Sequence, residues 1–248
     1  MALASYGLAE VLVRAGIVGG YVMIGVLYLL GLPFLHGLRD APGRTVQSAV
    51  PGSALPTGEL ALLLGTMALI GFGTGPTWSF MERVGMRMGL DLERIGFFYL
   101  VATCIGIVGP VLTGVLGGRS GRTRPIAIAQ VGLGLSCVAI VHAQSEAAYF
   151  AGMVGLLVTY MFLYPFVMAT IACFDPAGRV GPAAAGLFFF VLGLGPFLGG
   201  LLVTYGSYET PGWFGIGILG AAALLLTLRG GSLNRLAGAA AERKGGNP

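Results

Sequence analysis

Charged side chains are scarce in this chain of 248 residues. Asp, Glu, Lys and Arg make up only 10% of it, whereas a soluble domain carries about 25%. Apolar residues make up 56%, and the mean hydropathy is +0.87. This shortage of charge excludes an ordinary soluble domain. The formal charge of +4 comes from Arg and Lys at the ends of apolar segments, so we interpret it as an orientation signal and expect no nucleic-acid partner.

Residues that bind metals or carry out nucleophilic chemistry are also few. Cys104, Cys137 and Cys173 lie within apolar segments without close ligand spacing, and His36 and His142 are the only histidines. These counts imply neither a disulfide framework nor a zinc site. The sequence contains neither paired carboxylates nor a cluster of a nucleophile and a base, the patterns that would indicate an enzyme. We therefore expect no metal, no cofactor and no catalytic activity.

What the sequence has instead is long apolar runs. A run of about 20 residues crosses a hydrocarbon core of about 30 Å as a helix, and the alternating pattern of an outer-membrane barrel does not occur. We predict an all-α, polytopic membrane helix bundle with about seven transmembrane helices. The predicted spans are residues 8–35, 58–82, 95–117, 125–143, 147–172, 181–205 and 212–229.

The basic residues predict how these helices face the membrane. Ten Arg and Lys fall in segment 36–57, in the connections 118–124 and 173–180, and in the C-terminal part from Arg229 onward, against three between the second and third helices. By the positive-inside rule, the C-terminus is cytoplasmic and the N-terminus is outside. The predicted organisation is a single helix in 1–35, a cytoplasmic linker in 36–57, six helices in 58–229 and a cytoplasmic tail in 230–248.

The densest basic segment points to a family. It is the turn Gly114-Val-Leu-Gly-Gly-Arg119-Ser-Gly121-Arg122-Thr-Arg124, set between two apolar runs. It resembles the loop G-x-L-x-D-R-x-G-R-[R/K] of the major facilitator superfamily (MFS) of secondary transporters, which joins the second and third helices of each six-helix half. The matching positions are Gly114, Leu116, Arg119, Gly121 and Arg122. Arg124 lies one place beyond the last basic position, and Gly118 replaces the acidic residue. The resemblance implies a gating role for this loop. The alternative is an orientation signal alone, and both can hold together.

A second fragment in the sixth span resembles the same superfamily. Gly195-Pro196-Phe-Leu-Gly199-Gly200 is similar to the end of a motif in the fifth helix of antiporter members, from which we take a role in helix bending and packing. One helix, a linker and six helices then correspond to the sixth to twelfth helices of a twelve-helix carrier. Such carriers bind substrate between two halves. We therefore expect a truncated carrier that lacks its N-terminal half, or a half that assembles with a second copy.

The resemblance places the first helix of a half along the substrate pathway. In this helix the polar candidates for the substrate cavity are Thr74, Thr77, Trp78 and Glu82. Trp78 offers an aromatic face for stacking, and it is alternatively an anchor at the bilayer boundary. Glu82 is a substrate contact, a proton-coupling carboxylate or a solvated loop residue. The sequence leaves these alternatives open.

The fourth helix of the half supplies two further candidates. Tyr160 and Tyr164 are four residues apart, so they lie on one helix face, and Pro165 removes a backbone hydrogen bond next to them. The alternatives are lining of the cavity and packing with satisfied hydroxyl groups. For Gln130 we expect a hydrogen bond between helices rather than a ligand contact.

These patterns together predict a secondary active transporter of the MFS type. It would move a small solute across the cytoplasmic (inner) membrane by alternating access, with a proton or another ion as the coupling partner. The alternative is a non-transporting half that serves as a membrane partner or assembly protein. A retinal protein with seven helices is excluded, because Lys244 in the tail is the only lysine.

Overall fold

A computed structural model describes residues 57–116, 121–175, 178 and 180–231, together with Val22, Val26 and Leu29. The chain divides into two compact units, Met1–Val50 and Pro51–Pro248. In the first unit the three described residues are helical. Apart from these three residues, the predicted first span lies outside the described residues, as do the predicted linker up to residue 56 and the tail beyond residue 231. The fold described below is that of the second unit.

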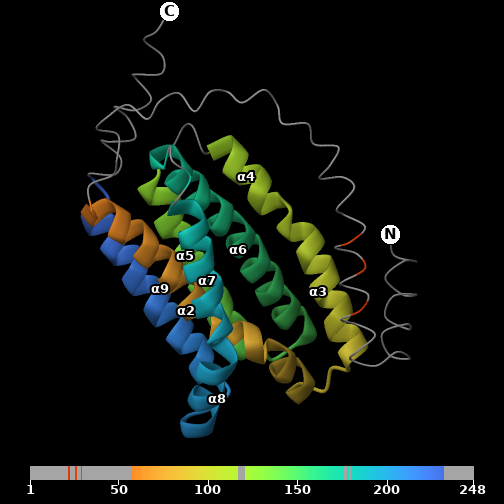
Figure 1. The fold of residues 1–248 in the computed structure, drawn as a ribbon. Helices are drawn as coiled ribbons and strands as arrows, with labels where there is room; N and C mark the ends of the chain where they lie inside the picture. Colours follow the sequence, from red (N-terminus) through yellow and green to blue (C-terminus); the bar gives the residue numbers. More distant parts are fainter. Residues whose placement is uncertain are drawn as a thin grey trace, which may run out of the picture. The chain divides into compact units, whose positions relative to one another are not determined.

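The described part of the second unit consists of helices joined by short connections (Figure 1). In chain order they are α2 (Thr57–Arg87), α3 (Leu92–Gly106), α4 (Val108–Leu116), α5 (Thr123–Val141), α6 (Glu146–Phe174), α7 (Val180–Gly193), α8 (Gly195–Tyr205) and α9 (Thr210–Arg229). The predicted all-α class is confirmed, and no strand occurs among the described residues.

Six of these stretches are long and apolar enough to cross a membrane. They are Gly58–Arg87, Leu92–Leu116, Thr123–Val141, Glu146–Ala172, Val180–Tyr205 and Thr210–Arg229. The chain is therefore an integral membrane protein that contacts the lipid bilayer. One boundary needs correction: the second predicted span ends at residue 82, but α2 continues to Arg87. Arg83 and Arg87 thus lie on the helix and not in a loop.

Two of the six spans are interrupted, and proline explains both interruptions. The span Leu92–Leu116 breaks at Ile107 before Pro110, and the span Val180–Tyr205 breaks at Leu194 before Pro196. Proline has no backbone N–H and clashes with the preceding turn. In both spans the residue before the proline is a glycine that touches another helix. A Cβ at Gly109 would lie 2.6 Å from the backbone nitrogen of Phe162 in α6, and one at Gly195 would lie 2.5 Å from the carbonyl carbon of Gly75 in α2.

The six spans repeat one plan of three helices. Each set has a long helix with an internal proline, a broken helix and a shorter helix. The first set is α2, α3 with α4, and α5; the second is α6, α7 with α8, and α9. Pro76 and Pro165 occupy the same position counted from the start of α2 and α6. Because each set has three spans, successive sets cross the membrane in opposite directions, so the second set is an inverted copy of the first.

The packing follows the same repeat. The broken span α3/α4 of the first set packs along α6 of the second set. The broken span α7/α8 of the second set packs along α2 of the first. In each case a broken span thus packs against the long helix of the other set. The shorter helices α5 and α9 pack against each other, and α5 also contacts α6 as α9 contacts α2. Figure 1 shows α2 and α9 running side by side, with α3 and α4 in line along α6. Of the six spans, α2 is the most buried, followed by α5 and then α6.

Candidate functional site

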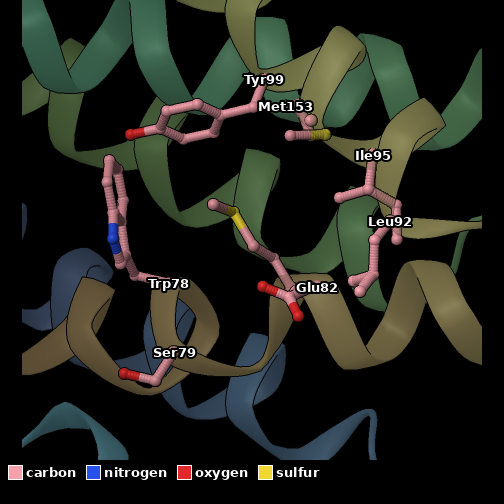
Figure 2. A pocket seen from close by; sticks show the side chains of 9 residues that line it. Trp78, Ser79, Glu82, Leu92, Ile95, Tyr99 and Met153 are labelled. Atoms are coloured by element: carbon pink, nitrogen blue, oxygen red, sulfur yellow. The ribbon is translucent and has the colours of Figure 1, made fainter. Parts of the chain in front are cut away.

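A pocket of about 370 Å³ lies between α2 and α3, with one side chain of α6 at its wall (Figure 2). From α2 it is lined by Trp78, Ser79, Met81 and Glu82, from α3 by Leu92, Ile95, Gly96 and Tyr99, and from α6 by Met153. Because α2 and α3 are joined by a short turn, residues before and after that turn lie at similar depth. The pocket therefore lies in the half of the bundle nearer the Arg87 end of α2.

The aromatic rings of the pocket continue into the bundle as a strip. We define the aromatic strip as Tyr99, Trp78, Tyr160, Tyr164 and Phe188, which belong to α3, α2, α6 and α7. Successive ring centroids are 6.0, 5.5, 6.5 and 5.1 Å apart. Such spacings are those of rings in direct contact. The strip thus connects the pocket with the second three-helix set.

The polar ends of these rings are not used in hydrogen bonds within the described part of the protein. The indole N–H of Trp78 and the hydroxyls of Tyr99, Tyr160 and Tyr164 form no hydrogen bond with the described residues. The hydroxyl of Ser79, in contrast, donates to the carbonyl of Gly75 at 2.8 Å. Aromatic rings with polar tips offer both an apolar surface and hydrogen-bond donors. This combination is typical of small-molecule sites.

Other side chains around the pocket hold its walls in place. The hydroxyl of Tyr149 in α6 donates to the carbonyl of Met81 in α2 at 2.8 Å. Met153, one turn further along α6, is fully buried. At the start of α3, Asp91 caps the helix by accepting from the backbone N–H of Arg94 at 2.7 Å. The pocket is therefore built on three helices that are fixed to one another.

Four of the predicted cavity residues belong to the pocket or its strip, and two do not. Trp78 and Glu82 line the pocket, and Tyr160 and Tyr164 extend the strip. Thr77 instead faces α9, where its hydroxyl donates to the carbonyl of Pro211 at 3.1 Å. Thr74 is fully buried, and its hydroxyl has no partner among the described residues. Neither threonine lines the pocket.

The hydrogen bond between helices that was predicted for Gln130 is not found among the described residues. Its side chain is fully buried in α5, and neither its amide oxygen nor its amide nitrogen has a hydrogen-bond partner among the described residues. The expected hydrogen bond between helices is thus not present.

The predicted gating loop lies at the opposite end of the bundle from the pocket. Gly114 and Leu116 belong to α4, Arg119 lies outside the described residues, and Gly121 has the positive φ of 66° that favours glycine. Arg122 precedes α5, and its guanidinium donates to the hydroxyl of Thr170 in α6 at 3.4 Å. Arg124 is exposed. One arginine of this loop therefore connects α5 with the last turns of α6.

In the second predicted motif, three residues lie at close contacts or at the helix break, and one does not. Gly195 packs on the backbone of Gly75, and a Cβ at Gly199 would lie 2.6 Å from the ring of Phe80. Pro196 follows the break at Leu194. A Cβ at Gly200 would meet nothing within 4 Å, so Gly200 does not take part in the predicted packing.

Tyr99 and Phe188 are the site residues that sequence reasoning missed. A signal for Tyr99 was present: it follows the turn after α2 at about the distance by which Trp78 precedes it, so an antiparallel hairpin brings the two rings together. Phe188 lies in a run of three phenylalanines, and no pattern in that run marks the one that turns inward.

Comparison of the chain with models of protein families, with curated proteins and with solved structures gives no match.

Proposed function

We propose that this protein is a secondary active transporter of the MFS type, in which the six described spans form one half of the carrier. The observation that carries the proposal is the inverted repeat of three spans, with a broken middle helix in each set. Halves built from two inverted sets of three helices are the architecture of MFS carriers. The basic loop that contains Arg122 supports the same assignment, because it joins the second and third helices of this half.

The face that carries the pocket and the aromatic strip belongs to the substrate pathway in this proposal. Trp78 and Tyr160 come from α2 and α6, the first and fourth helices of the half, and their ring centroids are 5.5 Å apart. Transport requires a second six-helix half opposite this face, supplied by another half of the carrier or by a second copy of the chain. With a cytoplasmic C-terminus in the inner membrane, the pocket opens toward the outside.

A test of alternating access needs no knowledge of the substrate. Tyr160 lies near the middle of α6 and within the strip, so Tyr160→Cys reports access to the pathway. It is made in a chain with Cys104, Cys137 and Cys173 replaced by serine. In sealed vesicles that hold the full chain, an impermeant maleimide is added outside or trapped inside. We expect modification from both sides, because a carrier exposes its centre to each side in turn.

Leu135→Cys is the matched control. Leu135 lies on the outward stripe of α5 and is 55% exposed in the bundle, so lipid covers it and neither reagent should reach it. Modification of Tyr160→Cys from one side only would contradict alternating access and would favour a non-transporting membrane partner.

A further inference from the structure

The pocket presents two aromatic walls at a right angle. The rings of Trp78 and Tyr99 have centroids 6.0 Å apart and planes inclined by 87°. Figure 2 shows them as two sides of a corner, with the carboxylate of Glu82 beside the same space. A cation within about 6 Å of the face of a tryptophan or tyrosine ring is attracted by the negative charge on that face. The two rings are in edge-to-face contact and both line the pocket, and aromatic surface of this kind favours a cationic ligand.

Glu82 adds a full negative charge to this corner. It lies four residues after Trp78, hence on the same face of α2. Its carboxylate makes no ion pair or hydrogen bond with the described residues. Glu82 is exposed at the pocket, and a carboxylate that forms no ion pair attracts a ligand of opposite charge.

The neighbouring arginines do not neutralise Glu82. Arg83 lies over the ring of Phe80 at 4.8 Å, and Arg87 lies over the ring of Tyr208 at 4.2 Å. Arg94 pairs with Glu146 at 3.2 Å. All three guanidinium groups of the Arg87 end are thus directed at other partners, and none of them lines the pocket.

The remaining walls suit an apolar, methylated ligand better than a metal or a sugar. Met81, Ile95 and Met153 contribute apolar, polarizable surface. A metal ion would need several carboxylate, histidine or cysteine ligands, and no such cluster occurs among the described residues. A sugar would need many hydrogen-bonding groups. The volume of 370 Å³ is at the low end of the range of about 300–1,000 Å³ for ligand pockets.

We propose that the pocket binds a small organic ammonium ion, such as a quaternary or tertiary amine. Trp78 and Tyr99 contact its alkyl groups, and Glu82 balances its charge. The proposal names a substrate class and rests on the proposed function for transport. The binding it predicts is measured without transport.

The binding experiment uses the full chain in lipid nanodiscs with radiolabelled choline as the probe. Its neutral carbon isostere, 3,3-dimethylbutan-1-ol, has the same shape without the charge. We expect saturable binding of choline and no competition by the isostere at equal concentration. The chain has two tryptophans, so Trp213→Phe leaves Trp78 as the only one. In this variant choline should change the tryptophan fluorescence over the same concentration range as it binds.

Substitutions then assign the binding to these residues. Glu82→Gln should weaken choline binding about tenfold. Glu59→Gln, at the other end of α2, is the control and should leave binding unchanged. Tyr99→Leu should weaken binding about fivefold to tenfold, whereas Tyr99→Phe keeps the ring and should change it by no more than about twofold.

A further variant fills the pocket without disturbing the fold. Gly96 lines the pocket, and a Cβ there would meet no atom within 4 Å. Gly96→Leu should therefore abolish choline binding while the protein stays folded. Gly217→Leu, at an equally open position of α9, is the control and should bind normally.

The outcomes separate this proposal from the proposed function. If choline does not bind, if the isostere competes equally, or if Glu82→Gln and Tyr99→Leu bind as the unchanged chain does, the ammonium site is refuted. If Tyr160→Cys is nevertheless labelled from both sides, the proposed transport function is still supported. Choline binding with labelling from one side only supports the site and refutes the transporter.

Discussion

The two three-helix sets share a backbone plan but differ in what they carry. Counted from Pro76 and Pro165, the positions of Trp78 and Glu82 in α2 correspond to Val167 and Ile171 in α6. Both of the latter are buried and apolar. Counted from the prolines of the broken spans, Tyr99 corresponds to Ala185. The same scaffold therefore forms apolar packing in the second set and an aromatic, acidic pocket in the first. The fold does not require the pocket residues, which argues that they serve binding.

The ends of the two long helices show the same difference. At the Arg87 end, α2 meets α3 around the pocket and Glu82 remains unpaired by the described residues. At the other end, the corresponding turns of α6 contain Thr170, which receives a hydrogen bond from Arg122. At one end a carboxylate lines a pocket, and at the other end an arginine joins the start of α5 to the last turns of α6.

The largest effect is expected where both sets depend on the same close contact. Gly195→Leu and Gly109→Leu would each drive a side chain into the backbone of a long helix. Over-packing typically costs about 1–3 kcal/mol, and backbone atoms cannot move aside, so we expect about 3 kcal/mol or more for each. Thermal unfolding of the purified chain measures this. Gly200→Leu, which enters open space, should unfold as the unchanged chain does. If only one of the two substitutions caused a large loss of thermal stability, the two three-helix sets would not be equivalent.

A second experiment makes the first set resemble the second. The triple change Trp78→Val, Glu82→Ile and Tyr99→Ala copies the second-set residues into the pocket. Choline binding should fall about 100-fold or more, because two cation–π contacts and one charge are lost together. Radioligand binding measures the loss, and size-exclusion chromatography checks that the protein remains folded. Retained binding would show that the difference between the sets has no role in recognition.

A smaller effect is expected from the hydrogen bond that joins the two long helices. Tyr149→Phe removes the donor to the carbonyl of Met81. Hydrogen bonds between membrane helices contribute about 0.6 kcal/mol on average and up to about 1.7 kcal/mol, so thermal stability should fall by a comparable amount. Tyr164→Phe removes a hydroxyl that has no partner among the described residues, and it should leave the stability unchanged. Equal losses in the two variants would contradict the assignment.

The smallest effect on stability is expected from an exposed ion pair on the surface of the bundle. Arg94 and Glu146 join the start of α3 to the start of α6, and their side chains are 55% and 54% exposed. Exposed ion pairs contribute about 0–1 kcal/mol and are screened by salt. Glu146→Gln should therefore lower stability by less than about 1 kcal/mol, and the difference should vanish at high salt. A large loss that is independent of salt would show that this pair holds the sets together.

The sequence predicted the helices well because each span is set by apolar length alone. It missed the end of α2, where Glu82, Arg83 and Arg87 look like loop residues. The helix continues because both arginines find aromatic rings, Phe80 and Tyr208, beside it. Bending was expected at Pro196, whereas the break at Pro110 was not foreseen. Proline alone does not separate a break from the unbroken helix at Pro165.

The site was only partly predictable for a related reason. The helix α2 is buried on several sides, so its pattern of apolar residues does not mark one inward face. Thr77 and Trp78 are neighbours in sequence, yet Thr77 faces α9 and Trp78 faces the pocket. Which neighbour each residue meets depends on the packing of the broken helices, and the sequence does not encode that packing as a periodicity.

The most direct test of the account combines the pocket with the two-sided pathway. The rates at which Tyr160→Cys is modified from outside and from inside are measured with and without saturating choline. Because the ring of Trp78 contacts position 160, a ligand that participates in alternating access should change the ratio of the two rates. Glu82→Gln should make that ratio insensitive to choline. An unchanged ratio in a chain that binds choline would contradict the claim that the pocket belongs to a transporter.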